Sequence, residues 1–164
     1  MTQVGEAVSP DGNTVVSIKT DAAGRYFYSV RQNGEDIIYA SRLVLKTDAA
    51  YFTPGASFRQ DTVEEVTDDY QLYQGKHQGE IKDTCTEDTV TLTKDGKELT
   101  VVLRVYDDGI AYRYEMNEGT SVTQEASEFV FPDQAAFLSY EQPNVTYEHI
   151  QPLEGGHSAA AEQR

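Results

Sequence analysis

Residues 105–115, which read VYDDGIAYRYE, place two short runs of alternating residues on either side of an Asp-Gly step. Upstream, apolar side chains occupy every second position from Leu99 to Val105, and downstream they do so from Ile110 to Met116. A period of two is typical of a strand with one buried face, and an Asp-Gly step between two such strands is a strong hairpin signal. The segment therefore predicts a tight antiparallel β-hairpin.

Similar turn signals recur at short intervals along the chain. Asn33-Gly34 and Asp95-Gly96 each separate two alternating runs and predict two-residue hairpin turns. Between the turn signals we expect strands at residues 14–20, 25–32, 37–40, 42–47, 89–94, 97–106 and 121–131. No window shows a sustained helical period with caps, so the predicted class is all-β, an antiparallel β-sandwich built from hairpins.

Two internal regions and the carboxy-terminal end do not fit this pattern. Residues 49–58 and 70–85 have mixed polarity with Pro or Gly, and we expect them to form loops over a sheet face. The length of 164 residues suits one domain, which we assign to residues 1–150. Residues 151–164 predict an extended or disordered tail.

The charge of the chain excludes some classes of partner. There are 28 acidic and 13 basic side chains, which give a formal net charge of -15. Such a chain repels phosphate backbones and anionic lipid surfaces, so we expect neither nucleic acid nor a membrane as a partner. The sequence has no apolar run of the ~20 residues that span a bilayer, and its opening residues, MTQVGEAV, lack the features of a secretory signal.

The sequence contains no recognisable catalytic motif. The histidines His77, His149 and His157 are too scattered to predict a metal site, and Cys85, the only cysteine, predicts a core or edge thiol. The adjacent acids Glu64 and Glu65 would point to opposite faces of a strand and cannot act together across one sugar. We therefore predict no catalytic residue in this chain.

Two Tyr-Glu steps stand out in the irregular segment LSYEQPNVTYEHI. Glu141 follows Tyr140 and Glu148 follows Tyr147. Exposed carboxylates beside aromatic rings can bind ions or sugars. A surface loop with solvated acids explains the same pattern, so both interpretations stay open at this point.

The chain resembles the amino-terminal β-sandwich of glycoside hydrolase family 97. VYDDGIAYRYE is the most specific segment of the resemblance, and three further segments are similar in order: residues 9–47, 75–92 and 132–148. Members of that family are exo-acting α-glucosidases or α-galactosidases. The resemblance implies a galactose mutarotase-like super-sandwich, of which this chain is the first part, followed in the parent protein by a catalytic (β/α)8 barrel.

The resemblance also implies a metal site and a location. In the family, the amino-terminal domain lends one glutamate to an active-site calcium ion; by position Glu148 is the best match, with Glu141 in reserve. Calcium needs about six to eight oxygen ligands, so we expect none to bind tightly to this chain by itself. The resemblance further implies a periplasmic or extracellular parent protein, whose signal peptide is absent from this sequence.

Three functional hypotheses follow from the residues and the resemblance. The first is a noncatalytic domain that supports the barrel and contributes to its sugar and calcium site. The second is a free-standing carbohydrate-binding β-sandwich, and the third is a mutarotase-like sugar epimerase in which His77 or His149 faces a carboxylate. An incomplete sandwich would also expose strand edges, so self-association is expected.

Overall fold

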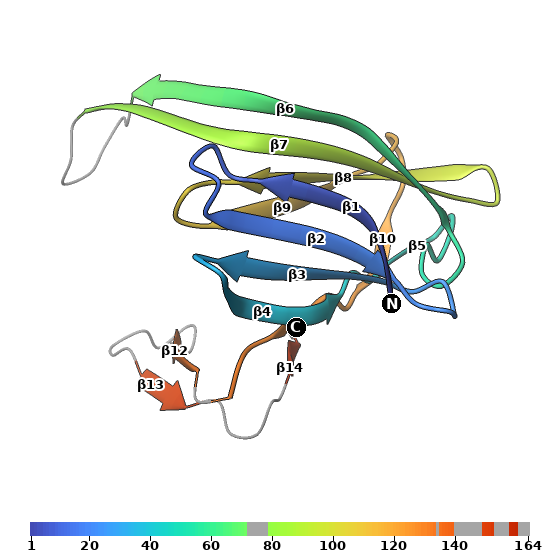
Figure 1. The fold of residues 1–164 in the computed structure, drawn as a ribbon. Helices are drawn as coiled ribbons and strands as arrows, with labels where there is room; N and C mark the ends of the chain where they lie inside the picture. The colour runs from blue at the N-terminus through green and yellow to red at the C-terminus, as the bar shows by residue number, and fades with distance from the viewer. Residues whose placement is uncertain (72–78, 134, 140–148, 153–157, 161–164) are drawn as a thin grey trace.

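The computed structural model describes residues 1–71, 79–133, 135–139, 149–152 and 158–160, and these residues form strands and loops without a helix (Figure 1). The predicted all-β class is confirmed. The strands are β1 (Thr2–Val8), β2 (Thr14–Thr20), β3 (Tyr26–Gln32), β4 (Glu35–Arg42), β5 (Leu45–Thr47), β6 (Ser57–Gln71), β7 (Glu80–Lys94), β8 (Lys97–Val105), β9 (Ile110–Glu115), β10 (Val122–Glu125), β11 (Glu128–Val130), β12 (Ala136–Ser139), β13 (His149–Pro152) and β14 (Ser158–Ala160). In the described part of the chain, no helix could cross a membrane.

Two antiparallel sheets form the layers of a sandwich. One has the order β1-β2-β3-β4-β11-β14 and the other β6-β7-β8-β9, and Figure 1 shows them stacked. Two small pairs, β5 with β10 and β12 with β13, complete the described strands. Two buried clusters fill the space between the layers: Ile18, Tyr26, Leu45, Phe52, Ala56, Val90, Leu92, Leu99 and Val101 in one, and Ala7, Val16, Tyr28, Val30, Leu43, Leu103 and Val105 in the other.

The alternation that predicted the strands also decides which side chains are buried. In β8 the side chains of Leu99, Val101, Leu103 and Val105 all face the core. Val102 is buried as well, although it belongs to the opposite face of the strand. Burial of the alternating set is the main stabilising contribution of β8, because apolar area leaves water on the side that meets the other sheet.

The predicted hairpin turns are confirmed, with one difference in geometry. Asn33 and Gly34 have φ angles of 51° and 84°, and Asp95 and Gly96 have 51° and 72°, as two-residue turns with two left-handed positions require. The hairpin at Asp108-Gly109 instead has a four-residue connection, residues 106–109, in which Tyr106 N donates to Gly109 O (2.8 Å).

The first sheet holds this longer connection in place. The carbonyl oxygen of Asp107 accepts hydrogen bonds from Thr14 Oγ1 and from Gln32 Nε2, both at 3.2 Å. These two donors come from β2 and β3, so the connection is shaped by tertiary contacts that its own sequence does not reveal.

The predicted loop at residues 70–85 is wrong at residues 70–71 and 80–85, which are strand, whereas residues 72–78 lie outside the described residues. β6 and β7 are each 15 residues long and pair continuously from Ser57↔Thr93 to Gln71↔Glu80, apart from one bulge after Gln60. This long hairpin projects beyond its neighbours in Figure 1. Most of β6 is exposed and polar, so its strand structure depends on backbone pairing and leaves no alternating apolar pattern in the sequence.

Several other strand boundaries differ from the predicted ones. β1 was not predicted, and the predicted strand at residues 121–131 divides into β10 and β11, which pair with β5 and β4 respectively. The predicted strand at 42–47 shortens to β5, whereas that at 37–40 lengthens to β4. Within the predicted tail, β14 is extended and pairs with β11.

Candidate interaction site

The two glutamates predicted as calcium ligands, Glu148 and Glu141, lie outside the described residues, as do His77 and His157. On either side of the Tyr-Glu segment, β12 and β13 pair, with Ser139 opposite His149. The described residues hold no group of three or more His, Cys, Asp or Glu side chains that could bind one metal ion.

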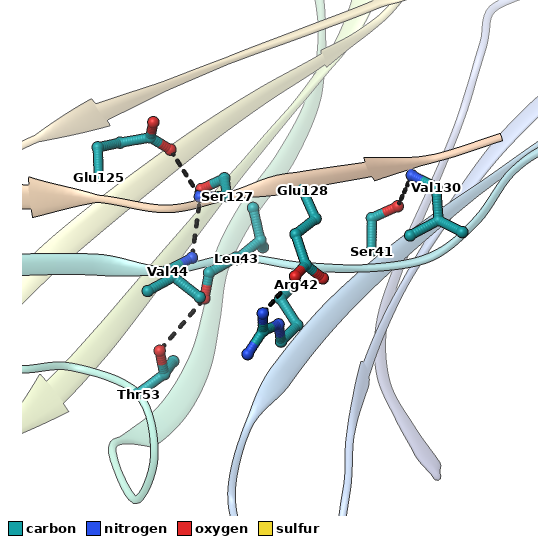
Figure 2. A network of polar contacts seen from close by, with 9 residues as sticks. All are labelled: Ser41, Arg42, Leu43, Val44, Thr53, Glu125, Ser127, Glu128 and Val130. Carbon is teal, nitrogen blue, oxygen red and sulfur yellow. Dashed lines mark hydrogen bonds and ion pairs between the residues drawn. The ribbon is translucent and has the colours of Figure 1, made fainter. Parts of the chain in front are cut away.

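A polar network joins β4 and β11 and the residues next to them (Figure 2). Ser41 Oγ accepts a hydrogen bond from Val130 N (2.8 Å), and Ser127 Oγ accepts one from Val44 N (3.2 Å). Arg42 forms an ion pair with Glu128, and this hydrogen-bonded partner lowers the pKa of the Glu128 carboxyl. β11 has only one paired position with β4, Val130↔Tyr39, so these side chains supply much of its attachment.

The aromatic side chains of the same region pack in the hydrophobic core or against it. Tyr28, Tyr112, Tyr114 and Phe129 form a cluster in which contacting ring centroids are 5.8 to 6.4 Å apart. The hydroxyl of Tyr28 donates to Glu128 O (2.9 Å), and burial raises its pKa. Their rings pack against one another within the sandwich, which is the structural role expected of tyrosines on strands.

Asp88 is a buried carboxylate that no sequence pattern identified. Its side chain faces the core from β7 and is 0% exposed. Oδ2 accepts a hydrogen bond from Gln60 Nε2 (3.0 Å), but Oδ1 has no partner. Burial raises the pKa of this carboxyl. The arrangement favours the protonated acid, because an ionised group with half of its oxygens unpaired would be costly there.

The adjacent acids Glu64 and Glu65 lie at consecutive positions of β6, opposite Glu87 and Thr86. They therefore point to opposite faces of the sheet, as expected. Glu87 and Asp68 both bind Arg104, at 2.7 and 2.6 Å. Because these acids are separated or already paired, they do not form the facing carboxyl pair that glycoside hydrolysis needs.

A hollow lies at one end of the sandwich, between three segments of the chain. Residues 47–49, the start of β8 at 97–98 and the β9–β10 connection at 116–120 line a space of about 360 Å³, which we call the end hollow. Phe52 and Met116 provide its apolar wall. The three segments are far apart in the sequence and share no motif.

Comparison with known families identifies the fold. The glycosyl-hydrolase 97 N-terminal family matches residues 7–160, nearly the whole chain. The chain belongs to this family. A comparison with curated proteins finds no match.

Solved structures agree with the family assignment. The chain is similar to a β-arabinopyranosidase, with a TM-score of 0.75, 26% identity and coverage of 83% of this chain and 23% of the enzyme. It is also similar to a glycoside hydrolase family 97 enzyme from Pseudoalteromonas sp. strain K8 in complex with acarbose, with a TM-score of 0.64, 26% identity and coverage of 82% of this chain and 22% of the enzyme. The chain thus spans less than a quarter of either enzyme, and the resemblance read from VYDDGIAYRYE is confirmed.

Proposed function

We propose that this chain is the noncatalytic amino-terminal domain portion of a family 97-like α-glycosidase. It would support a catalytic barrel and complete one side of its sugar pocket. The observation that carries the proposal is the family match over residues 7–160 together with the small share, 22 to 23%, of each similar enzyme that the chain covers. Hydrolysis by these enzymes is expected to require the other three quarters of their chains, which this chain does not cover.

The chemistry of the described residues supports the noncatalytic part of the proposal. A glycosidase needs two carboxyl groups about 5 to 10 Å apart on either side of the scissile bond. Asp88 is enclosed in the core, and Glu87 and Asp68 are bound to Arg104. These three carboxyls are therefore not free to flank a scissile bond.

A contribution to calcium binding extends the proposal and rests on the resemblance alone. We propose that Glu148, or Glu141 in reserve, supplies one carboxylate to an ion whose other ligands belong to the catalytic domain. In a protein that contains both domains, Glu148→Gln should weaken calcium binding in a calorimetric titration, whereas Glu141→Gln should not. Unchanged affinity in both variants would remove the metal-binding role, and a loss in Glu141→Gln alone would assign it to Glu141.

Hydrolysis assays test the main proposal. The purified chain is incubated with p-nitrophenyl α-glucoside, α-galactoside and β-arabinopyranoside, with and without calcium, beside a complete family 97 enzyme as positive control. We expect release of p-nitrophenol only by the complete enzyme. Turnover by the chain that survives repurification and disappears in its Glu148→Gln or Glu141→Gln variant would contradict a noncatalytic role.

A carbohydrate-binding role is the second candidate, and the end hollow favours it. Such a role is compatible with an isolated module or with a domain of a larger enzyme, because it requires no catalytic group. No described residue favours the epimerase hypothesis, since the side chains it needs lie outside the described part of the chain.

A further inference from the structure

The β6–β7 hairpin extends beyond the strand that supports its base. β8 pairs with β7 only as far as Thr86, whereas β6 pairs with β7 as far as Glu80. Figure 1 shows this end of the hairpin projecting from the two sheets. Because the sandwich does not enclose it, no side chain of residues 66–71 or 80–84 is buried. These side chains are available to another molecule.

One face of the hairpin alternates pairs of acids with pairs that contain apolar side chains. Side chains two positions apart on a strand share a face. The directly opposed pairs on this face, which we call the hairpin face, are Glu64↔Glu87, Val66↔Cys85, Asp68↔Asp83 and Tyr70↔Ile81. Tyr70 is 52% exposed. On the other face, residues 65–71 and 80–86 contribute only polar side chains, so apolar groups are confined to the hairpin face.

The acid pairs of the hairpin face repel each other in the isolated protein. Opposed Cα atoms of antiparallel strands are roughly 4.5 to 5.5 Å apart, and like charges at such positions destabilise a sheet. Arg104 binds Glu87 and Asp68, one member of each pair. Glu64 and Asp83 are exposed, and no ion pair in the described part of the chain includes either of them. The hairpin face therefore combines uncompensated negative charge with exposed apolar surface.

This combination selects a class of partner. Nucleic acids and anionic lipids are repelled by the charge, and a second copy of the chain would bring like charges together. The described residues hold no group of three or more acidic, His or Cys side chains that could share a metal ion, so the carboxylates act as separate charges. A protein segment with basic and apolar side chains complements both features of the hairpin face.

We propose that the hairpin face docks a cationic segment of another protein, in which two Lys or Arg side chains lie on either side of an apolar one. The two cations would meet Glu64 and Asp83, and the apolar side chain would pack on Val66 between them. The two acid pairs are four residues apart along β6, about 13 Å at the rise of an extended strand, which matches cations four residues apart in an extended partner. This inference goes beyond the proposed function, because docking here requires neither hydrolysis nor a metal ion.

The test is a titration of the ¹⁵N-labelled chain at low ionic strength with the peptide Thr-Lys-Thr-Leu-Thr-Lys-Thr-Leu-Thr, followed by amide chemical shifts. When extended, this peptide presents Lys and Leu alternately on one face. We expect saturable shifts at residues 64–70 and 81–87, and a lower affinity as salt is added. A peptide with Ser in place of Leu should bind more weakly, and one with Glu in place of Lys should not bind.

Variants of exposed side chains make the test specific. Glu64→Gln/Asp83→Asn removes two charges from the hairpin face, leaves the partners of Arg104 intact, and should weaken binding about fivefold. The matched control, Glu65→Gln/Asp69→Asn, removes the same charge from the other face of β6 and should have a clearly smaller effect. The amide spectrum of each variant checks that it is folded.

A second pair of variants tests the apolar contribution. Tyr70→Thr removes the most exposed ring of the hairpin face and should weaken binding, because less apolar area is buried. Val63→Thr, also at an exposed position of β6 but on the other face, should leave the affinity unchanged.

The remaining outcomes contradict the proposal. No saturable shifts with the Lys-Leu peptide, shifts confined to other residues, or equal binding of the Glu peptide would overturn it. An equal loss of affinity in both double variants would indicate unspecific attraction to the net charge. Concentration-dependent shifts of the same residues without peptide would make a second copy the occupant instead. Hydrolysis by the chain would contradict only the noncatalytic function, so the two proposals can fail independently.

Discussion

At the scale of single residues, Asp88 departs most from ordinary core chemistry. It shares the inner face of β7 with the core residues Val90 and Leu92, and one of its oxygens has no hydrogen-bond partner. A buried carboxyl in this state is stable when protonated and destabilising when ionised. Its effect on the protein should therefore depend on pH.

The direction of this pH dependence follows from the raised pKa. Between the unfolded pKa of 3.8 and the higher folded value, the folded state binds more protons than the unfolded state. The contribution of Asp88 to stability is thus fully present below pH 3.8 and is lost as the pH rises through the folded pKa. Carboxyls with lowered pKa, such as Asp61 and Glu128, act in the opposite sense, so a comparison of variants is needed.

Asp88→Asn removes the ionisation and is expected to stabilise the protein at pH 7 by about 1 to 3 kcal/mol relative to the unsubstituted chain. The gain should shrink as the pH falls toward 3.8. Urea unfolding at several pH values measures it, with Asp95→Asn at an exposed turn as the control. A gain independent of pH, or equal in the control, would show that Asp88 is not the titrating group.

At the scale of elements, the long β6 strand is mostly exposed, so contacts outside the core must help to hold it on the sheet. Arg104 of β8 lies next to β7 and reaches across it. Its Nε bonds Glu87 Oε2 on β7 at 2.7 Å, and its Nη1 bonds Asp68 Oδ2 on β6 at 2.6 Å. The hydrogen bond with Glu87 and the charge of Asp68 raise the pKa of Arg104. The two contacts link three strands through one side chain.

Arg104→Lys should therefore destabilise the protein by about 1 to 2 kcal/mol, because an ammonium group cannot reproduce the forked contacts. The matched control is Arg113→Lys, whose pair with Glu115 involves side chains about half exposed and should be worth less than about 0.5 kcal/mol. Urea unfolding gives both values. In hydrogen exchange, faster exchange of β6 amides is expected in Arg104→Lys only, and equal effects of the two substitutions would contradict this role.

At the scale of the whole molecule, the sandwich leaves β6 at the edge of one sheet and β1 at the edge of the other. β6 exposes Val63 and Tyr70, at 51% and 52%, beside several acidic side chains. Apolar residues on an unpaired strand favour association, whereas like charges oppose it. The net charge of -15 makes this balance sensitive to salt.

We expect a monomer at low ionic strength and increasing self-association as salt is added, as measured by sedimentation velocity. The double variant Glu64→Gln/Glu65→Gln should associate at lower salt than the unsubstituted chain. The double variant Glu35→Gln/Asp95→Asn removes the same charge away from β6 and should have a smaller effect. Association that is independent of salt, or that responds equally to both variants, would contradict a role for the β6 edge.

The sequence by itself determined the class, the hairpins and the family. Asn33-Gly34 and Asp95-Gly96 require left-handed backbone positions, and the alternation from Leu99 to Val105 fixes which face of β8 is buried, so local chemistry is sufficient for both. The resemblance of VYDDGIAYRYE to the family is confirmed by a match that extends over residues 7–160.

Only the tertiary structure decided the long polar hairpin, the unpaired buried oxygen of Asp88 and the end hollow. β6 carries too few buried apolar residues to give a periodic signal, and Asp88 in sequence resembles any other acid of the chain. The end hollow joins residues 47–49, 97–98 and 116–120. Such features arise from contacts between distant segments, which a local pattern does not encode.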